Sequence, residues 1–178
     1  MKHYRDLSAD ERGLARAFLE RMDLDDQVHH FQCAMTDGDF NVWEERAQSH
    51  RLIGCFDHNR LIGMAEIAQN RDQVECSLYV DAEHRRKGIG TALFERACTS
   101  ARDSGAHHLT ILVTRGDAEM MDMAVQHDGL SVFRHGKSMI LPEGDHATAR
   151  WLIFELDSVS PETWFSRAVR NVREHLGL

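Results

Sequence analysis

The sequence predicts an α/β (α+β) fold, in which helices flank a mixed central sheet of about six to seven strands and an extra helix follows at the C-terminus. Two patterns predict the sheet. The β-rich runs Arg51–Phe56 and Leu61–Ile67 are separated by a short polar turn at 57–60, which indicates a β-hairpin. The runs Val74–Val80 and Leu109–Val113 are separated by a helix-like segment, and this β-helix-β order predicts parallel neighbours.

Length and composition fit one globular domain. The chain has 178 residues, 42% of them hydrophobic and 28% charged. We expect a single domain over 1–178, with a core at about 2–141 and a C-terminal strand and helix at 147–178. No apolar run approaches a membrane span, and the segment Met1–Asp6 lacks the apolar region of a signal peptide. We therefore expect a cytoplasmic protein with no membrane partner.

Charge and metal-binding residue types exclude other classes of function. A net charge of −8 argues against a nucleic-acid partner. The histidines show no metal-ligand spacing such as H-E-x-x-H, so no metal site is expected. The four cysteines are widely spaced, and we interpret them all as reduced core thiols: Cys33, Cys55, Cys76 and Cys98.

The segment before the hairpin predicts a short strand at Lys2–Leu7 and two helices. Ser8 with Glu11 forms a capping-box pattern, and the helix it starts carries an apolar stripe. The members of that stripe are Leu14, Phe18 and Met22, with Ala15 and Leu19 beside it. Asp25 or Asp26 would cap the second helix, with Val28, Phe31 and Met35 facing inward, and Thr36–Asp39 would break it.

The segments after the hairpin complete the order of elements. A helix after Val80 places Ile89, Leu93, Ala97 and Ala101 on one face and ends at Ser104-Gly105. A further helix starts near Asp117 and ends at Asp128-Gly129. Strands at Ser131–Leu141 and Thr148–Leu156 follow, and Ser160-Pro161 opens a last amphipathic helix. That helix would pack on its own domain or form a dimer contact, so both a monomer and a homodimer stay open.

The segment from Arg85 to Thr91 predicts an anion site. A basic loop with Gly88 and Gly90 stands between a strand and a helix start, where unpaired amides and the helix dipole attract negative charge. The glycines allow close approach of the backbone to a ligand. Neither a Walker loop nor a G-x-G-x-x-G fingerprint is present. The expected ligand is a pyrophosphate or a cluster of phosphates.

Arg85-x-x-Gly88-x-Gly90, following Leu78-Tyr79-Val80-Asp81, resembles motif A of the GNAT acetyltransferases. The resemblance runs from about Leu52 to Gly129. It implies the GNAT fold, the activity of an N-acetyltransferase, and acetyl-CoA as cosubstrate. The residues that it implies for acetyl-CoA binding are Leu78, Tyr79, Val80, Arg85, Arg86, Lys87, Gly88, Ile89, Gly90, Thr91, Asp117 and Met120. In that family, strand-end amides near Tyr79 and Val80 would hold the thioester oxygen.

The helix after Asp117 resembles motif B of the same family but departs from it at several positions. Asp117 stands where asparagine is usual, and an aspartate cannot donate as an amide does. Leu130 stands where phenylalanine is usual. The tyrosine that protonates the leaving thiolate in many of these enzymes is missing at Ala124, so Tyr79 or a water molecule would serve.

Glu75 is the candidate general base, because an alkyl amine with a pKa near 10.4 must lose a proton before it attacks. Glu75 lies ten residues before Arg85, the spacing that resembles bacterial protein-lysine acetyltransferases. In many other family members the glutamate lies at the position of Val74, and a bulge in the strand would reconcile the two.

Three functions remain open from the sequence. The first is acetylation of a primary amine on a protein lysine. The second is acetylation of a small-molecule amine such as a polyamine, amino sugar or amino acid, using the same chemistry. The third is an acetyl-CoA-binding sensor without turnover. The acceptor wall, from Leu14 to Trp43, would distinguish the first two.

Overall fold

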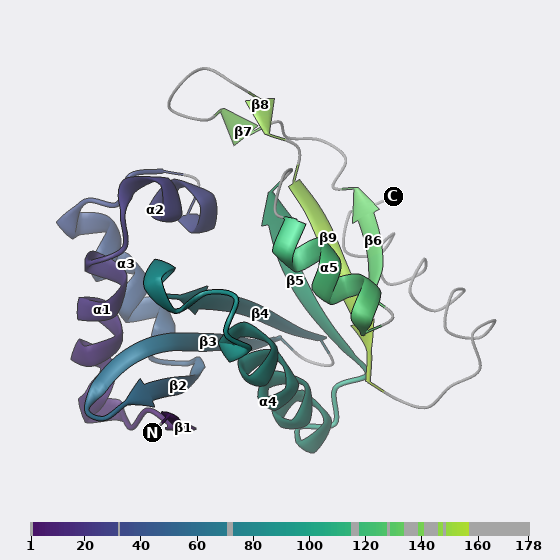
Figure 1. Cartoon of the computed structure of the whole chain (residues 1–178), viewed down its shortest axis with the longest axis horizontal. Coiled ribbons are helices and arrows are strands. Elements are labelled where there is room, and N and C mark those ends of the chain that lie inside the picture. Colours follow the sequence, from purple (N-terminus) through teal and green to yellow (C-terminus); the bar gives the residue numbers. More distant parts are fainter. Residues whose placement is uncertain are drawn as a thin grey trace.

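The computed structural model describes residues 2–31, 33–70, 73–114, 118–127, 129–133, 139–140, 146–147 and 149–156. Within them, seven strands form one sheet in the order β1-β2-β3-β4-β5-β9-β6, while β7 and β8 pair separately (Figure 1). The strands are β1 (Lys2–Asp6), β2 (Arg51–Asp57), β3 (Arg60–Asn70), β4 (Gln73–Val80), β5 (His108–Thr114), β6 (Leu130–Phe133), β7 (Met139–Ile140), β8 (His146–Ala147) and β9 (Ala149–Glu155). The predicted sheet of six to seven strands is confirmed.

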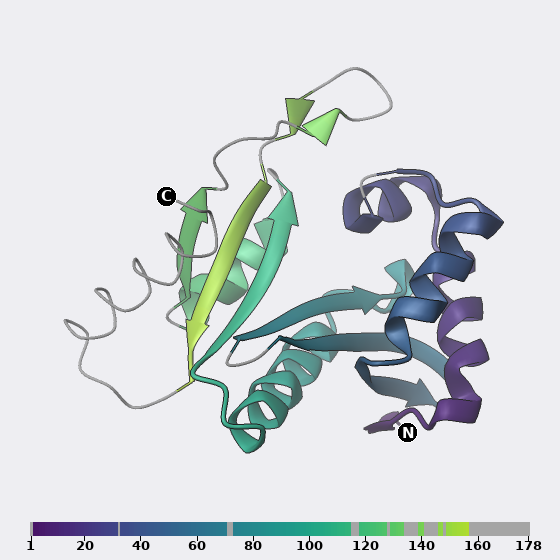
Figure 2. The same ribbon diagram turned by 180° about the vertical axis from the view of Figure 1, so that it is seen from behind.

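Helices cover both faces of the sheet (Figures 1 and 2). They are α1 (Arg12–Glu20), α2 (Leu24–Phe31), α3 (Asp37–Ala47), α4 (Ile89–Asp103) and α5 (Ala118–Gln126). Two hydrophobic clusters result. The α4-side cluster joins α4 and α5 to one face of the sheet. The α1/α3-side cluster joins α1 and α3 to the other face, with Phe31 of α2 packed against it.

The order of strand pairing confirms both sequence patterns. β2 and β3 pair antiparallel as a hairpin, and β4 pairs parallel with β5. The parallel pairing is short: it covers Gln73↔His108, Val74↔Leu109 and Glu75↔Thr110. Beyond these pairs β4 and β5 diverge, as Figures 1 and 2 show. Among the described residues, this divergence leaves one edge of β4 without a neighbouring strand toward Val80.

Helix α4 forms as the apolar spacing predicts. All four predicted inward residues, Ile89, Leu93, Ala97 and Ala101, are buried. The helix ends where expected, because Gly105 adopts a left-handed φ of 79° and the amide of Ala106 then bonds the carbonyl of Ala101 at 3.0 Å.

The N-terminal helices depart from the predictions in three places. Leu14 is 44% exposed, so it does not belong to the buried stripe of α1. The cap of α2 is Asp23, whose Oδ1 accepts from the amide of Asp26 at 2.8 Å. Thr36 does not simply break α2: it caps a third helix, α3, by a reciprocal bond pair with Asp39. The predicted Ser8–Glu11 capping box is confirmed.

The C-terminal third is described only in part. The predicted strand Ser131–Leu141 overlaps two strands of different sheets, β6 and β7, and β9 matches the predicted strand at Thr148–Leu156. The helix predicted from Ser160 onward lies outside the described residues. Cys55, Cys76 and Cys98 are buried free thiols, but Cys33 is exposed, so the core interpretation is wrong for Cys33. Among the described helices, none is long and apolar enough to cross a membrane.

Candidate active site

The loop between β4 and α4 has the backbone of an anion site. Gly88 caps α4 with a left-handed φ of 76°, a conformation that strains any residue with a Cβ. Its carbonyl accepts from the amide of Ala92 at 3.0 Å, which makes Gly88 the start of the helical ladder. The first amides of α4 therefore have no partners within the helix, and the positive end of the helix dipole lies at this loop.

A cavity of about 410 Å³ opens beside this loop. It is lined from four elements: Leu78 and Val80 of β4; Arg85, Arg86 and Gly90 at the loop and helix start; Ala118, Glu119, Met120 and Met123 of α5; and Asp25, Asp26 and His30 of α2. A Cβ at Gly90 would lie 3.8 Å from Met123 Cε and 3.9 Å from Val80 Cγ2. The protein itself therefore has room for a side chain at Gly90, and the glycine keeps that room for a ligand.

The predicted cofactor residues other than Tyr79, Gly88 and Thr91 divide into three groups. Leu78, Val80, Arg85, Arg86, Gly90 and Met120 line the cavity. Ile89 is buried in the α4-side cluster, and the exposed Lys87 donates to the carbonyl of Glu83 at 2.7 Å. Asp117 lies outside the described residues. The cavity residues are those that can hold a pyrophosphate and a pantetheine arm.

The free edge of β4 presents backbone groups to this opening. The amide of Asp81 bonds the carbonyl of Ile62 in β3 at 3.0 Å. Because amide directions alternate along a strand, the amide of Tyr79 also points to β3, whereas those of Leu78 and Val80 point away from β3. Of the amides near Tyr79 and Val80, the one at Val80 thus faces the opening, together with that of Leu78.

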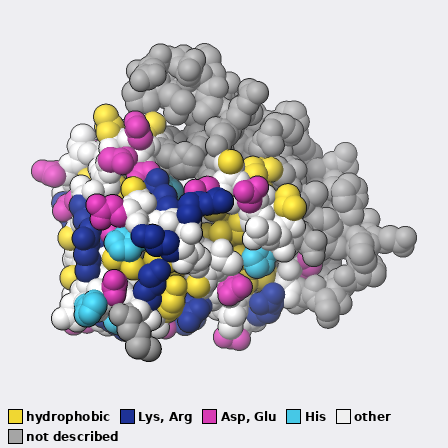
Figure 3. All heavy atoms as spheres, in the orientation of Figure 1, with side chains coloured by type: hydrophobic (Ala, Val, Ile, Leu, Met, Phe, Trp, Pro, Cys, Tyr) yellow, Lys and Arg dark blue, Asp and Glu magenta, His cyan; other side chains and the backbone are white. Residues whose placement is uncertain are grey.

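Ion pairs attach the loop to its surroundings. Arg85 contacts Asp26 of α2 at 2.5 Å, and Arg86 lies 3.8 Å from Glu119 of α5. Before the loop, Asp81 forms ion pairs with Arg21 at 3.2 Å and with Arg60 at 3.3 Å. Figure 3 shows basic and acidic side chains interspersed over this face of the molecule. The loop cations are therefore already paired with protein groups.

Glu75 stands where β4 and β5 separate. It is exposed and forms the last pair with β5, opposite Thr110. The side chain lies on the face of β4 that also carries Ser77 and Tyr79, away from α4. The predicted bulge in this strand is wrong, since β3 and β4 pair without a register shift along the whole of β4.

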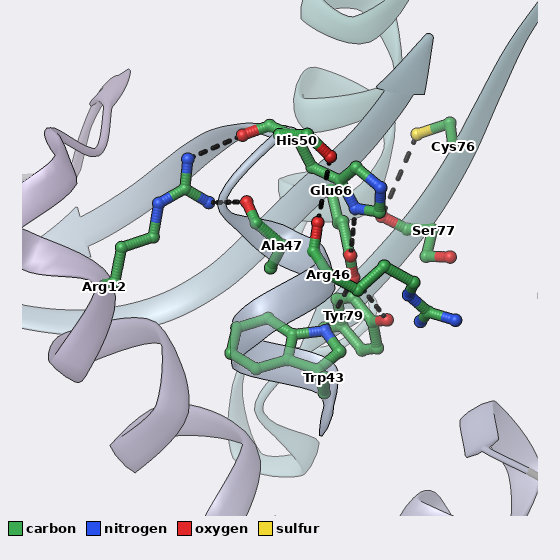
Figure 4. A network of polar contacts seen from close by, with 10 residues as sticks. Arg12, Trp43, Arg46, Ala47, His50, Glu66, Cys76, Ser77 and Tyr79 are labelled. Carbon is green, nitrogen blue, oxygen red and sulfur yellow. Dashed lines mark hydrogen bonds and ion pairs between the residues drawn. The ribbon is translucent and has the colours of Figure 1, made fainter. Parts of the chain in front are cut away.

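A buried carboxylate that the sequence reasoning did not identify lies on this same face (Figure 4). Glu66 Oε2 accepts from Trp43 Nε1 at 3.0 Å and from the Tyr79 hydroxyl at 3.1 Å. Its other oxygen, Oε1, is 2.7 Å from Nδ1 of His50. Arg12 of α1 holds the turn that carries His50, by donating to two carbonyls there. The available signal was a single charged residue within the apolar run Leu61–Ile67.

The hydrogen bonds decide the charge of Glu66. Burial raises the pKa of this carboxyl, but the bonds from His50, Trp43 and Tyr79 outweigh burial, so its pKa lies below the ordinary value. For Tyr79, burial and then the charge of Glu66 raise the pKa well above 10. Tyr79 therefore stays protonated, and its hydroxyl donates a hydrogen bond to an ionised carboxylate. Its role as acid for a thiolate stays a prediction.

Among the described residues, no group of three or more His, Cys, Asp or Glu side chains could hold a metal ion. The site consists instead of a helix N-terminus, two arginines, a cavity lined by both apolar and charged side chains, and a free strand edge. This donor set suits a phosphorylated cosubstrate with a long uncharged arm, and the arrangement fits acetyl-CoA.

Comparisons with known proteins agree with this site. The sequence matches the acetyltransferase (GNAT) family over residues 11–126, more than half of the chain. No curated protein matches it. An N-acetyltransferase of Staphylococcus aureus Mu50 shares the fold with a TM-score of 0.69 at 16% identity, over 88% of this chain and 99% of that chain.

Two further solved structures are similar. YncA of Salmonella typhimurium, a presumed acetyltransferase solved with its cofactor acetyl-CoA, has a TM-score of 0.67 at 15% identity, over 90% of this chain and 96% of its own. The GNAT domain of S. lividans PAT has a TM-score of 0.67 at 15% identity, over 86% and 90%. At these identities the structures show the fold, and the sequence match shows the family. The chain belongs to the acetyltransferase (GNAT) family and is an N-acetyltransferase whose cosubstrate is acetyl-CoA.

Proposed function

We propose that the protein transfers the acetyl group of acetyl-CoA directly to a primary amine, and that this amine is a protein lysine. The observation that carries the proposal is the separation of β4 from β5 directly beside the Arg85–Gly90 loop. A cosubstrate with its pyrophosphate at the loop can extend its arm along the free edge of β4. The amides of Leu78 and Val80 then face the thioester oxygen.

Glu75 is proposed as the base. The amine nitrogen bonds to the thioester carbon, its proton passes to the Glu75 carboxylate directly or through water, and the CoA thiolate leaves. Glu75 is exposed to solvent at the point where the strands separate, so an acceptor can reach it. A carboxylate there also favours a cationic acceptor over a neutral one.

The choice of a protein lysine as acceptor rests on the sequence. The spacing of Glu75 and the missing motif-B tyrosine resemble protein-lysine acetyltransferases, and the net charge of −8 favours a cationic acceptor. Structures with this fold include a ribosomal-protein-S18-alanine N-acetyltransferase of Escherichia coli and a presumed phosphinothricin N-acetyltransferase. The fold thus accepts proteins and small molecules, and a polyamine, amino sugar or amino acid is the alternative acceptor.

The test combines an acceptor panel with one substitution. Thiol release from acetyl-CoA is measured with lysine peptides, polyamines and amino sugars, and Glu75→Gln should lower kcat about 10²-fold without weakening acetyl-CoA binding. Glu95→Gln, an exposed glutamate of α4, is the matched control. Near-normal turnover of Glu75→Gln at neutral pH would place the base elsewhere. If the protein binds acetyl-CoA but releases no thiol from it with any of the acceptors, the sensor function would be favoured.

A further inference from the structure

The buried Glu66 carboxylate needs a physical reason, because glutamate is almost never fully buried in a protein core unless it is paired. Its residue is 5% exposed, and desolvating a carboxylate costs several kcal/mol unless strong hydrogen bonds compensate. Its three hydrogen-bonding partners come from three places: Trp43 in α3, His50 in the turn before β2, and Tyr79 in β4. Figure 4 shows these side chains converging on Glu66. The carboxylate therefore joins the helical wall to the strand that borders the cavity.

Tyr79 is the member of this network whose backbone borders the site. It lies between Leu78 and Val80, whose side chains line the cavity and whose amides point to the opening. The Tyr79 side chain points the opposite way and is 3% exposed. Fixing the hydroxyl of Tyr79 consequently fixes the two peptide units on either side of it, and with them the direction of both amides.

We propose that Glu66 is a positioning residue for acetyl transfer, which holds the Tyr79 hydroxyl and so aims the Leu78 and Val80 amides at the thioester oxygen. This inference rests on the proposed function. Donors of this kind contribute only when they are aligned before the reaction, and a displacement of about 1 Å can cost 10²-fold in rate. A carboxylate with fixed partners on two other elements is a stiffer anchor than a neutral group or water.

The anchor role differs from an acid role for Tyr79. If Tyr79 gave its proton to the CoA thiolate, a phenolate would remain 3.1 Å from the ionised Glu66 oxygen in a buried site. The repulsion between the two anions opposes that step. Removing the Glu66 charge should therefore raise kcat if Tyr79 acts as the acid, and lower kcat if Glu66 acts as an anchor for Tyr79.

The experiment is a double-mutant cycle read in kcat at saturating acetyl-CoA, using Tyr79→Phe, Glu66→Gln and the double variant. Tyr79→Phe removes only the hydroxyl and keeps the ring. The ring centroid lies 5.8 Å from that of Phe31, on which it stacks, and 4.8 Å from that of His30. We expect each single variant to lower kcat about 10- to 100-fold. The double variant should be no slower than the slower single one, because both changes break the same contact.

Trp43→Phe is the matched control. It removes a donor from the same Glu66 oxygen but leaves the Tyr79 contact in place. If the carboxylate is merely structural, each of the three single variants should lose kcat in proportion to its own loss of stability. The positioning role predicts that Trp43→Phe loses stability but keeps kcat within about threefold. Acetyl-CoA affinity, measured by calorimetry, should stay within about twofold in every variant.

A second readout is independent of turnover. Amide NMR signals of Leu78 and Val80 should shift in Tyr79→Phe and Glu66→Gln but stay in place in Trp43→Phe. Unchanged signals, additive losses of kcat, or a faster Glu66→Gln enzyme would each overturn the inference. A wild-type protein that binds acetyl-CoA but acetylates nothing would overturn the proposed function, and the amide signals would still decide the role of Glu66. If Glu66→Gln does not fold, Tyr79→Phe with Trp43→Phe gives the same decision.

Discussion

The two faces of the sheet around β4 are built differently. The α4-side cluster is made of hydrophobic side chains, and it fixes the helix that follows the glycine loop. The α1/α3-side cluster contains Trp43 and Tyr79, whose polar atoms meet the buried Glu66. Alternate residues of one strand thus serve two tasks. Leu78 and Val80 border the cofactor cavity, while Tyr79 connects the same strand end to a polar network.

The largest expected effect sharpens this contrast on the apolar face. Leu93 of α4 is fully buried, so Leu93→Ala should lower the free energy of unfolding by about 2–5 kcal/mol. Urea unfolding measures the loss. Because Leu93 belongs to the α4-side cluster and is not among the residues that line the cavity, kcat per folded molecule should stay close to wild type. Leu14→Ala, at a position that is 44% exposed, is the control and should cost well under half as much.

The opposite result would break the comparison. If folded Leu93→Ala protein binds acetyl-CoA normally but turns over slowly, the α4 side also positions the reacting groups. The division between an apolar face for folding and a polar face for chemistry would then be wrong.

The second prediction concerns the place where the two sides meet. Asp26 of α2 contacts Arg85 at 2.5 Å, and both residues line the cavity. A pyrophosphate at the loop must compete with this carboxylate for the guanidinium. Asp26→Asn should therefore tighten the binding of CoA, measured by calorimetry, by about twofold to tenfold, the range of a partly exposed ion pair.

Asp25→Asn is the matched control for that measurement. Asp25 lines the same cavity from the same helical turn, and the structure shows no ion pair for it within the described residues. Its substitution should change CoA affinity less than that of Asp26. Weaker CoA binding by Asp26→Asn would mean that Asp26 holds Arg85 in place for the phosphates instead of competing with them.

The sequence predicted best what depends on neighbours along the chain. The glycine loop and α4 follow from two glycines and one apolar spacing, and Gly88 indeed adopts the conformation that favours glycine. Helix α3 was missed although its signal was present, because Thr36 and Asp39 form a capping box within four residues. The strand, loop and helix of the site were therefore accessible to local reasoning.

The Glu66 network could not be predicted in the same way. Its partners lie 13, 16 and 23 residues away along the chain, in three separate elements. A glutamate in a strand pattern is predicted to be exposed, and the sequence alone does not indicate that α3 covers Glu66. Likewise, the cations of the Arg85–Lys87 loop were predicted to bind phosphates. In the structure, Arg85 is paired with Asp26, which is far away in sequence.

The smallest expected effect is on the pH dependence of stability, and it compares Glu66 with an exposed carboxylate. Burial raises the pKa of Glu66, but its three hydrogen bonds lower the pKa by more than burial raises it. The net pKa is therefore below the ordinary value. The pKa of Glu11 is lowered to about 2, first by the hydrogen bond from Arg5 and then by Ser8. A group whose pKa is lower in the folded state contributes stability above its unfolded pKa, near 4.3, and loses it as pH falls toward the folded value.

Both carboxylates should therefore stabilise the protein fully at pH 6 and less below about pH 4.5. Salt distinguishes them, because the Arg5–Glu11 pair is at the surface and is screened, whereas the Glu66 bonds are buried. Unfolding in urea is measured between pH 6 and pH 3 at low salt and at 1 M salt. Glu11→Gln should flatten the profile only at low salt, and Glu66→Gln should flatten it at both. A Glu66→Gln profile that keeps the wild-type slope at 1 M salt would show that the bonds to this carboxylate do not favour its ionised form, and the polar face would then be no more sensitive to acid than the apolar one.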